Sequence, residues 1–145
     1  MRFILAAALL LPALVTPTQR VSASPMPACD SQQMLLLASL TDNLVNVAEK
    51  THANEKKAVS FASRAVTMEK ACMDVAKSPM EHGRVYLLMA HDMMLAAVAT
   101  DEMGDNQHAR VFANFSIKIW KEIASTNQYP VEIRKSAQKQ IDASK

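Results

Sequence analysis

The stretch SPMEHGRVYLLMAHDMMLAAVATDEMG, residues 78–104, decides the fold of this chain. It opens with Ser78 at a cap position, Pro79 at the first helical position and Glu81 at the third. These residue types satisfy the free amides of a helix N-terminus. Gly104 stands at the other end, where a left-handed residue commonly stops a helix. The stretch therefore predicts one long helix that ends just before this glycine.

This helix is apolar nearly all round between Val85 and Val98, with His91 and Asp92 as its main polar interruption. A helix without a polar face is usually buried on all sides. A membrane span is not expected, because the run is short and carries a charged residue at its middle. The helix ending at Met103 is therefore predicted to be the centre of a helical bundle, with the His91-Asp92 pair as a polar notch.

The flanking sequence places apolar residues at alternating three- and four-residue steps, the pattern of amphipathic helices. Asp30, with Gln33 in a capping box, is predicted to open the first helix, and Asp105 and Pro130 to open the last two. The expected core-facing residues are Leu37, Leu40, Leu44 and Val47, then Phe61, Ala65, Met68, Cys72 and Val75, then Ala109, Phe112, Phe115, Ile119, Trp120 and Ile123, and finally Ile133, Ala137 and Ile141. The fold is predicted to be all-α, a small antiparallel bundle of four main helices plus a short C-terminal helix.

Residues 31–77 have two interpretations. The polar stretch Glu49–Lys57 predicts a turn and hence a hairpin of two helices. The apolar stripes on either side also share one heptad register, so a single helix from Ser31 to Lys77 is the alternative. That helix would leave its apolar seam without a partner unless the protein dimerises. We favour the hairpin.

Glycine is scarce, with two residues in 145. Phosphate-binding loops and hairpin-rich β folds both use glycine where the backbone needs a positive φ or a close approach. Its scarcity therefore argues against both, and supports the all-helical fold.

The N-terminus has the pattern of an export signal. A short positive start is followed by an apolar run, Phe3–Val15, and by the small residues Val21-Ser22-Ala23. That run is too short to span a bilayer, and the small residues form a cleavage site. We predict a cleaved signal peptide at 1–23 and a single α-helical domain at 24–145, in a periplasmic or extracellular location.

The charge balance excludes two classes of partner. The chain has 16 Lys and Arg residues against 14 Asp and Glu, and loss of Arg2 and Arg20 with the signal leaves 14 of each. Binding to nucleic acid or to an anionic membrane surface requires concentrated positive charge. No nucleic-acid partner and no stable membrane span after signal cleavage are predicted.

Cys29 and Cys72 are the two cysteines, and an even number in an exported protein suggests a disulfide. If residues 31–77 form a hairpin, facing residue numbers sum to about 105. Cys29 then faces Val75 and Ala76, about one helical turn from Cys72. We predict a Cys29–Cys72 disulfide. The chain has no Cys-x-x-Cys motif, which argues against a redox-active centre.

The ten methionines raise the question of copper, because thioethers suit Cu(I). The candidate ligands are His82, Met89 and Met93, which fall with Tyr86 on one face of the central helix. His82 and Met89 are nevertheless about 10 Å apart along the axis. Methionine as an adaptable core residue is therefore the favoured interpretation, and no metal site or cofactor is predicted.

No catalytic residue is predicted. The chain has neither a Gly-x-Ser-x-Gly elbow nor two histidines four residues apart. We expect an exported helical protein that acts through contact with a protein partner. A Cu(I)-binding protein is one alternative. A small all-helical enzyme, with a polar pocket between helices, is the second.

Overall fold

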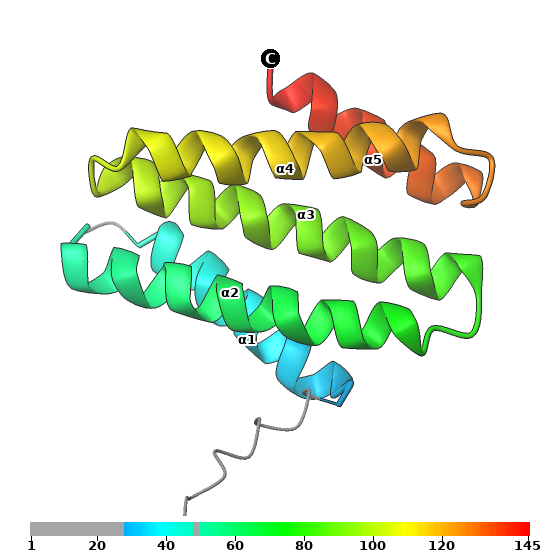
Figure 1. The fold of residues 1–145 in the computed structure, drawn as a ribbon, viewed down its shortest axis with the longest axis horizontal. Coiled ribbons are helices and arrows are strands. Elements are labelled where there is room, and N and C mark those ends of the chain that lie inside the picture. Colours follow the sequence, from blue (N-terminus) through cyan, green and yellow to red (C-terminus); the bar gives the residue numbers. More distant parts are fainter. Residues whose placement is uncertain (1–27, 48–49) are drawn as a thin grey trace, which may run out of the picture.

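The computed structural model describes residues 28–47 and 50–145, and in these residues it contains five α-helices and no strand (Figure 1). The helices are α1 (Ser31–Val45), α2 (His52–Asp74), α3 (Pro79–Glu102), α4 (Asn106–Ser125) and α5 (Val131–Ala143). The predicted all-α bundle is confirmed. The C-terminal helix α5 has 13 residues against 15 in α1, so it is almost as long as a main helix. The predicted signal peptide lies outside the described residues.

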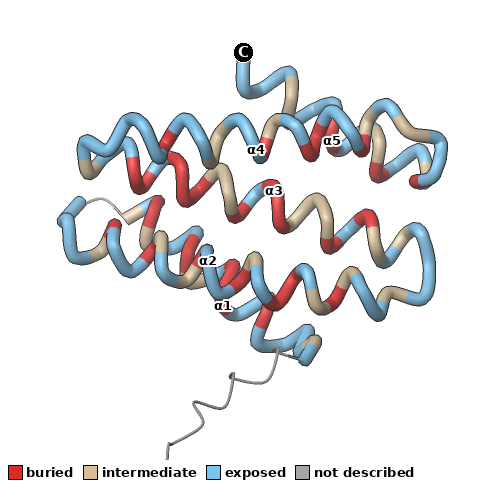
Figure 2. Tube along the Cα trace, viewed as in Figure 1, coloured by how far each residue is buried: buried red, intermediate tan, exposed pale blue. Residues whose placement is uncertain are grey.

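Helix α3 is the central element, as predicted. It packs against each of the other four helices, and α2 and α4 run antiparallel to it on either side (Figure 1). Helices α1 and α5 pass behind this layer in the view of Figure 1. Buried positions concentrate on α3 and on the sides of its neighbours that face it (Figure 2). Within the described residues, no helix is long and apolar enough to cross a membrane.

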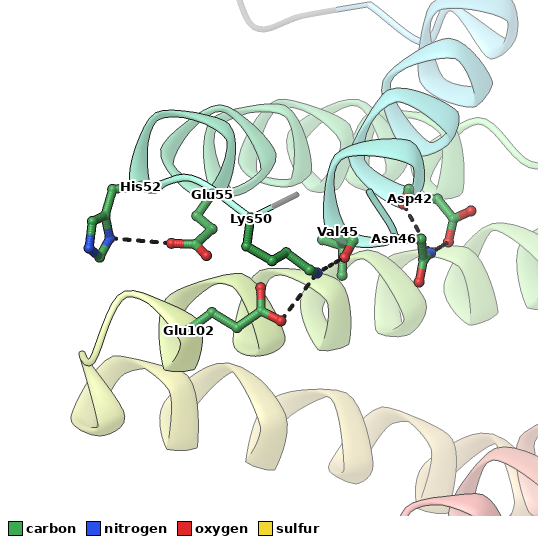
Figure 3. Close-up of polar contacts among 7 residues, drawn as sticks. All are labelled: Asp42, Val45, Asn46, Lys50, His52, Glu55 and Glu102. Atoms are coloured by element: carbon green, nitrogen blue, oxygen red, sulfur yellow. Dashed lines mark hydrogen bonds and ion pairs between the residues drawn. The ribbon is translucent and has the colours of Figure 1, made fainter. Parts of the chain in front are cut away.

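The segment between α1 and α2 makes these helices a hairpin rather than one long helix. Helix α1 ends at Val45, and α2 begins at His52 and packs against it. Lys50 ties this turn to the centre of the bundle (Figure 3). Its Nζ donates to the carbonyl oxygen of Val45 and lies 3.2 Å from Oε1 of Glu102, at the end of α3.

The predicted turn at Glu49–Lys57 is too long, because α2 already begins at His52. Thr51 is the N-cap, and its hydroxyl accepts a hydrogen bond from the amide of Asn54 at 3.2 Å. The side chain of Glu55 is buried, and its Oε2 lies 3.3 Å from Nδ1 of His52 (Figure 3). A polar stretch forms helix here because a capping residue starts it and packing covers its inward side.

The ends of α3 follow the predicted capping signals. The hydroxyl of Ser78 accepts a hydrogen bond from the amide of Glu81 at 3.1 Å. The Glu81 carboxylate accepts a hydrogen bond from the amide of Lys77 at 2.9 Å. In a capping box it would accept from the amide of the N-cap residue, Ser78, instead. Gly104 has a φ of +84°, the left-handed conformation expected at this stop.

The buried face of α1 differs from the predicted stripe. Leu37 is buried as expected, but Leu40, Leu44 and Val47 are only half-buried. The buried positions are instead Met34, Leu37, Ala38, Thr41 and Val45. Helix α1 packs on α2 and α3 together, and Thr41 tolerates this burial because its hydroxyl donates to the carbonyl oxygen of Leu37 at 2.9 Å.

Two further core predictions are wrong, and Phe61, Phe112 and Ile141 are only half-buried. Val75 is 60% exposed because α2 ends one residue earlier. Phe115 is 44% exposed, and the adjacent Ser116 is buried in its place. The Ser116 hydroxyl donates to the carbonyl oxygen of Ala90 at 2.6 Å, so a small polar residue can lie between α4 and α3.

Gly83 allows α5 to lie close against α3. A Cβ at this position would lie 2.8 Å from Cγ2 of Ile133 and 3.0 Å from Cδ1 of Tyr129. Both of these side chains are buried. This glycine therefore fixes the approach of the C-terminal helix to the centre of the bundle.

Candidate functional site

The most unusual chemical feature of the bundle is a pair of buried acids, Glu69 of α2 and Asp92 of α3. Both residues are 0% exposed. Glu69 continues the face of α2 that carries Ala58, Ala62 and Ala65, all of them buried. Small residues on that face allow α2 to pack closely on α3. The carboxyl group of Glu69 thereby reaches hydrogen-bonding range of Asp92.

Within residues 28–47 and 50–145, the two acids have no hydrogen-bonding partner apart from each other. Among the described residues, no donor group reaches any of the four carboxyl oxygens of Glu69 and Asp92. Two carboxylates cannot bond to each other, so the pair is satisfied only when one of them carries a proton. Burial, the hydrogen bond to Asp92 and the charge of Asp92 raise the pKa of Glu69 from 4.5 to about 10. The pair accordingly holds one proton at neutral pH.

The pKa of Asp92 is also above its ordinary value, because burial disfavours its charged form. The hydrogen bond from Glu69 and the charge of His91 lower this pKa, whereas Asp42 raises it. His91 and Asp42 lie nearer the surface, with Nε2 of His91 3.9 Å from Oδ1 of Asp42. The same Asp42 oxygen accepts from the side-chain amide of Asn46 at 3.0 Å (Figure 3).

This arrangement can hold one proton but cannot readily exchange it with a substrate. A general acid or base must reach the group it protonates, and both carboxyl groups are enclosed by helices. Nor do the described residues contain a group of three or more His, Cys, Asp or Glu side chains placed to hold a metal ion. The pair therefore couples pH to the packing of α2 on α3.

The predicted Cu(I) candidates lie in or beside one hydrophobic cluster. Met89 and Met93 pack in this cluster, which also contains Ile119 and Tyr129. His82 lies against Tyr129, whose hydroxyl is 3.0 Å from Nδ1 of His82, with the two rings stacked 5.7 Å apart. One imidazole nitrogen is thus occupied by a tyrosine, and the thioethers serve as core side chains.

A disulfide joins Cys29, just before α1, to Cys72 in α2, with their Cα atoms 4.6 Å apart. This is the pairing that the sequence predicts. Cys72 is 4% exposed and packs with Met34 and Met68. Cys29 is half-buried and lines a surface groove of about 380 Å³.

A second groove, of about 290 Å³, runs between α2 and α4. The Cα atoms of these two helices nowhere come within 8 Å of each other along the described chain, so α3 forms the floor. Met93 and Ala96 supply that floor, Val59 and Val66 line the α2 side, and Phe112 lines the α4 side. This groove is called the α2–α4 groove below.

Sequence reasoning anticipates Asp92 as a polar notch but misses Glu69. The missed signal is the helical face itself, because Ala58, Ala62, Ala65 and Glu69 follow one another at steps of four, three and four residues. A charged residue in line with three inward alanines must either reach the surface or find a buried partner.

Comparison of the chain with known protein families, with curated proteins and with solved structures finds no match.

Proposed function

We propose that this chain is an exported helical protein that acts by binding a protein partner in the α2–α4 groove. The observation that carries the proposal is the composition of that groove. Its floor is apolar, as are most of its lining side chains, and none of the five helices covers it. An apolar groove on a protein surface is the usual receptor for an amphipathic segment of another protein.

The shape of the groove suits a partner helix or extended segment that inserts apolar side chains over Met93. Methionine is flexible and polarisable, so a floor of this kind adapts to different side chains. Ser63, Thr67 and Lys70 lie along the α2 edge. The preferred partner segment therefore presents apolar side chains to the floor and an acidic or polar edge toward Lys70.

Two observations support export. The Cys29–Cys72 disulfide is of a kind that persists in oxidising compartments, such as the periplasm or the exterior of a cell. The N-terminal sequence has the charged start, short apolar run and small-residue cleavage site of a signal peptide. We therefore place the working protein, residues 24–145, outside the cytoplasm.

Site-specific photocrosslinking tests the proposed contact surface. A photoreactive amino acid at Ser63, on the edge of the α2–α4 groove, is expected to capture a discrete partner when the protein is expressed in its native host. The matched position is Ser136, which is exposed on α5. Equal capture at both positions would contradict the assignment of the groove.

A pair of valine substitutions makes the test independent of the probe position. Val59→Glu introduces a charge into the groove and is expected to abolish capture at Ser63. Val131→Glu introduces the same charge on α5, where the valine is already 48% exposed, and is expected to leave capture unchanged. Circular dichroism of both variants shows whether the fold is retained.

A further inference from the structure

We propose that the Cys29–Cys72 disulfide is a thiol–disulfide exchange site, attacked by a small zwitterionic thiol at Sγ of Cys29 through the groove beside it. The two cysteines differ in access. Cys29 lines a groove of about 380 Å³ and is half-buried. Cys72 does not line that groove and is 4% exposed. An external thiolate can therefore reach one sulfur and not the other.

The groove selects the class of thiol by its shape and charge. Ala71 of α2 and Val75, the residue after α2, give it apolar walls. Lys70 and Asp74 also line it, and they stand one helical turn apart on α2. No ion pair joins them in the part of the chain that the structure describes, which leaves both charges available to a ligand. A small thiol with a carboxylate and an ammonium group, such as an amino-acid thiol, matches this pattern.

The exchange proceeds in two balanced steps. In the first, the incoming thiolate forms a bond to Sγ of Cys29, the Cys29–Cys72 bond breaks, and its electron pair leaves on Sγ of Cys72. Cys72 then takes a proton from water, because its apolar surroundings disfavour a thiolate. In the second, another thiolate attacks the ligand sulfur of the mixed disulfide, releasing the oxidised ligand and the thiolate of Cys29. Two thiols are oxidised as one disulfide is reduced.

Opening the bond requires no helix to unfold. Helix α1 begins at Ser31, two residues after Cys29. The N-cap Asp30 is held independently, because its carboxylate accepts from the amides of Gln32 and Gln33 and its own amide donates to Sδ of Met68 at 3.3 Å. The first step therefore leaves α1, its N-cap and α2 in place. Cys72 remains in α2, where it can attack the mixed disulfide and close the bond again.

Mass spectrometry of the folded, oxidised protein tests the site of attack. After brief exposure to L-cysteine and an acid quench, we expect the mixed disulfide on Cys29 and a free, alkylatable thiol on Cys72. The rate is expected to rise in proportion to thiol concentration and to exceed the rate of global unfolding. An adduct on Cys72 would overturn the proposal. So would opening at the unfolding rate, whatever the thiol concentration.

A charge variant tests the recognition of a zwitterion. Lys70→Glu is expected to slow opening by L-cysteine roughly two- to fivefold, the effect of one exposed charge pair. Opening by 2-mercaptoethanol, whose thiolate carries no second charged group, should slow by less. Lys121→Glu, on the exposed side of α4, is the matched control and should change neither rate. If Lys70→Glu changes the two rates equally, or changes neither, the groove does not select zwitterionic thiols.

Discussion

Glu69→Gln tests whether the buried acid pair holds a proton. The pKa of Glu69 rises from 4.5 to about 10 through burial and the neighbouring Asp92. Between these pH values the folded protein binds one proton more than the unfolded chain, so the free energy of unfolding falls as the pH rises. The slope for one proton is about 1.4 kcal/mol per pH unit. The stabilisation is complete below pH 4.5 and is lost as the pH approaches 10.

Glutamine keeps the shape of the side chain but does not titrate, and its amide can donate to Asp92. At pH 7 the wild type has lost about 3 kcal/mol of the stabilisation it has in acid. The glutamine amide has a second proton, and if this proton finds no acceptor the variant loses about 1–3 kcal/mol of stability. This loss opposes the stabilisation that glutamine gains by not titrating. We therefore expect the variant at pH 7 to be as stable as the wild type or up to about 2 kcal/mol more stable. Its advantage should grow by about 1.4 kcal/mol with each further pH unit.

The assay is urea unfolding followed by far-UV circular dichroism, repeated from about pH 5 to about pH 9. The difference between the two proteins reports on the acid pair, because the titrating groups outside the pair are shared. Glu132→Gln, an exposed glutamate of α5, controls for the loss of one surface charge and should keep the wild-type slope. If Glu69→Gln has the same pH slope as the wild type, the acid pair does not hold the proton and the reasoning is refuted.

Substitutions at four other positions test the disulfide, the packing and the ends of the helices. Cys72→Ser should lower the free energy of unfolding by up to about 4 kcal/mol, and reduction of the wild type should give the same loss; an unchanged midpoint would show that the bond adds no stability. Gly83→Ala places a methyl group 2.8 Å from Ile133 and should cost about 1–3 kcal/mol in urea unfolding. Gly104→Ala meets no atom of the described residues within 4 Å, so its cost of about 1 kcal/mol comes from its positive φ, and a larger loss than at Gly83 would contradict this distinction. Ser78→Ala should cost about 1 kcal/mol by removing the cap of α3, and thermal unfolding should show Ser78→Thr to be the milder change.

The helix ends could be predicted from the sequence because they depend on local chemistry. Ser78 and Asp105 each accept a hydrogen bond from an amide three residues later, and Gly104 adopts the expected positive φ. These interactions lie within a few residues of one another. They therefore leave a pattern that can be identified without knowing the tertiary structure.

The buried faces could be predicted only in part, because they depend on which helices meet. The sequence marks Phe115 as apolar and Ser116 as polar, yet Ser116 is buried against Ala90 and Phe115 is partly exposed. Polarity alone does not show that a hydroxyl has a carbonyl partner on the next helix. The same limit hides Glu69, since its partner Asp92 lies on another helix, 23 positions along the chain.

The pairing of Glu69 with Asp92 could not be predicted from the sequence, whereas the pairing of the two cysteines could. Cys29 and Cys72 are the only residues of their kind in the chain, so their pairing has one solution once export is assumed. Carboxylates are numerous, and their pairing has many solutions. The α2–α4 groove likewise arises from the spacing of two helices whose described Cα atoms stay more than 8 Å apart, which no single segment of sequence encodes.

The central position of α3 has a consequence for how motion spreads through the molecule. Helices α1 and α5 each pack on α3, and in the described chain their Cα atoms nowhere come within 8 Å of each other. Either outer helix can therefore detach transiently while the opposite one stays in place. Amide hydrogen exchange should accordingly be slowest in α3, because the helices on both sides of α3 must detach before α3 can unfold. A structural change at Cys29 can therefore affect Tyr129, near the other end of the chain, only through α3.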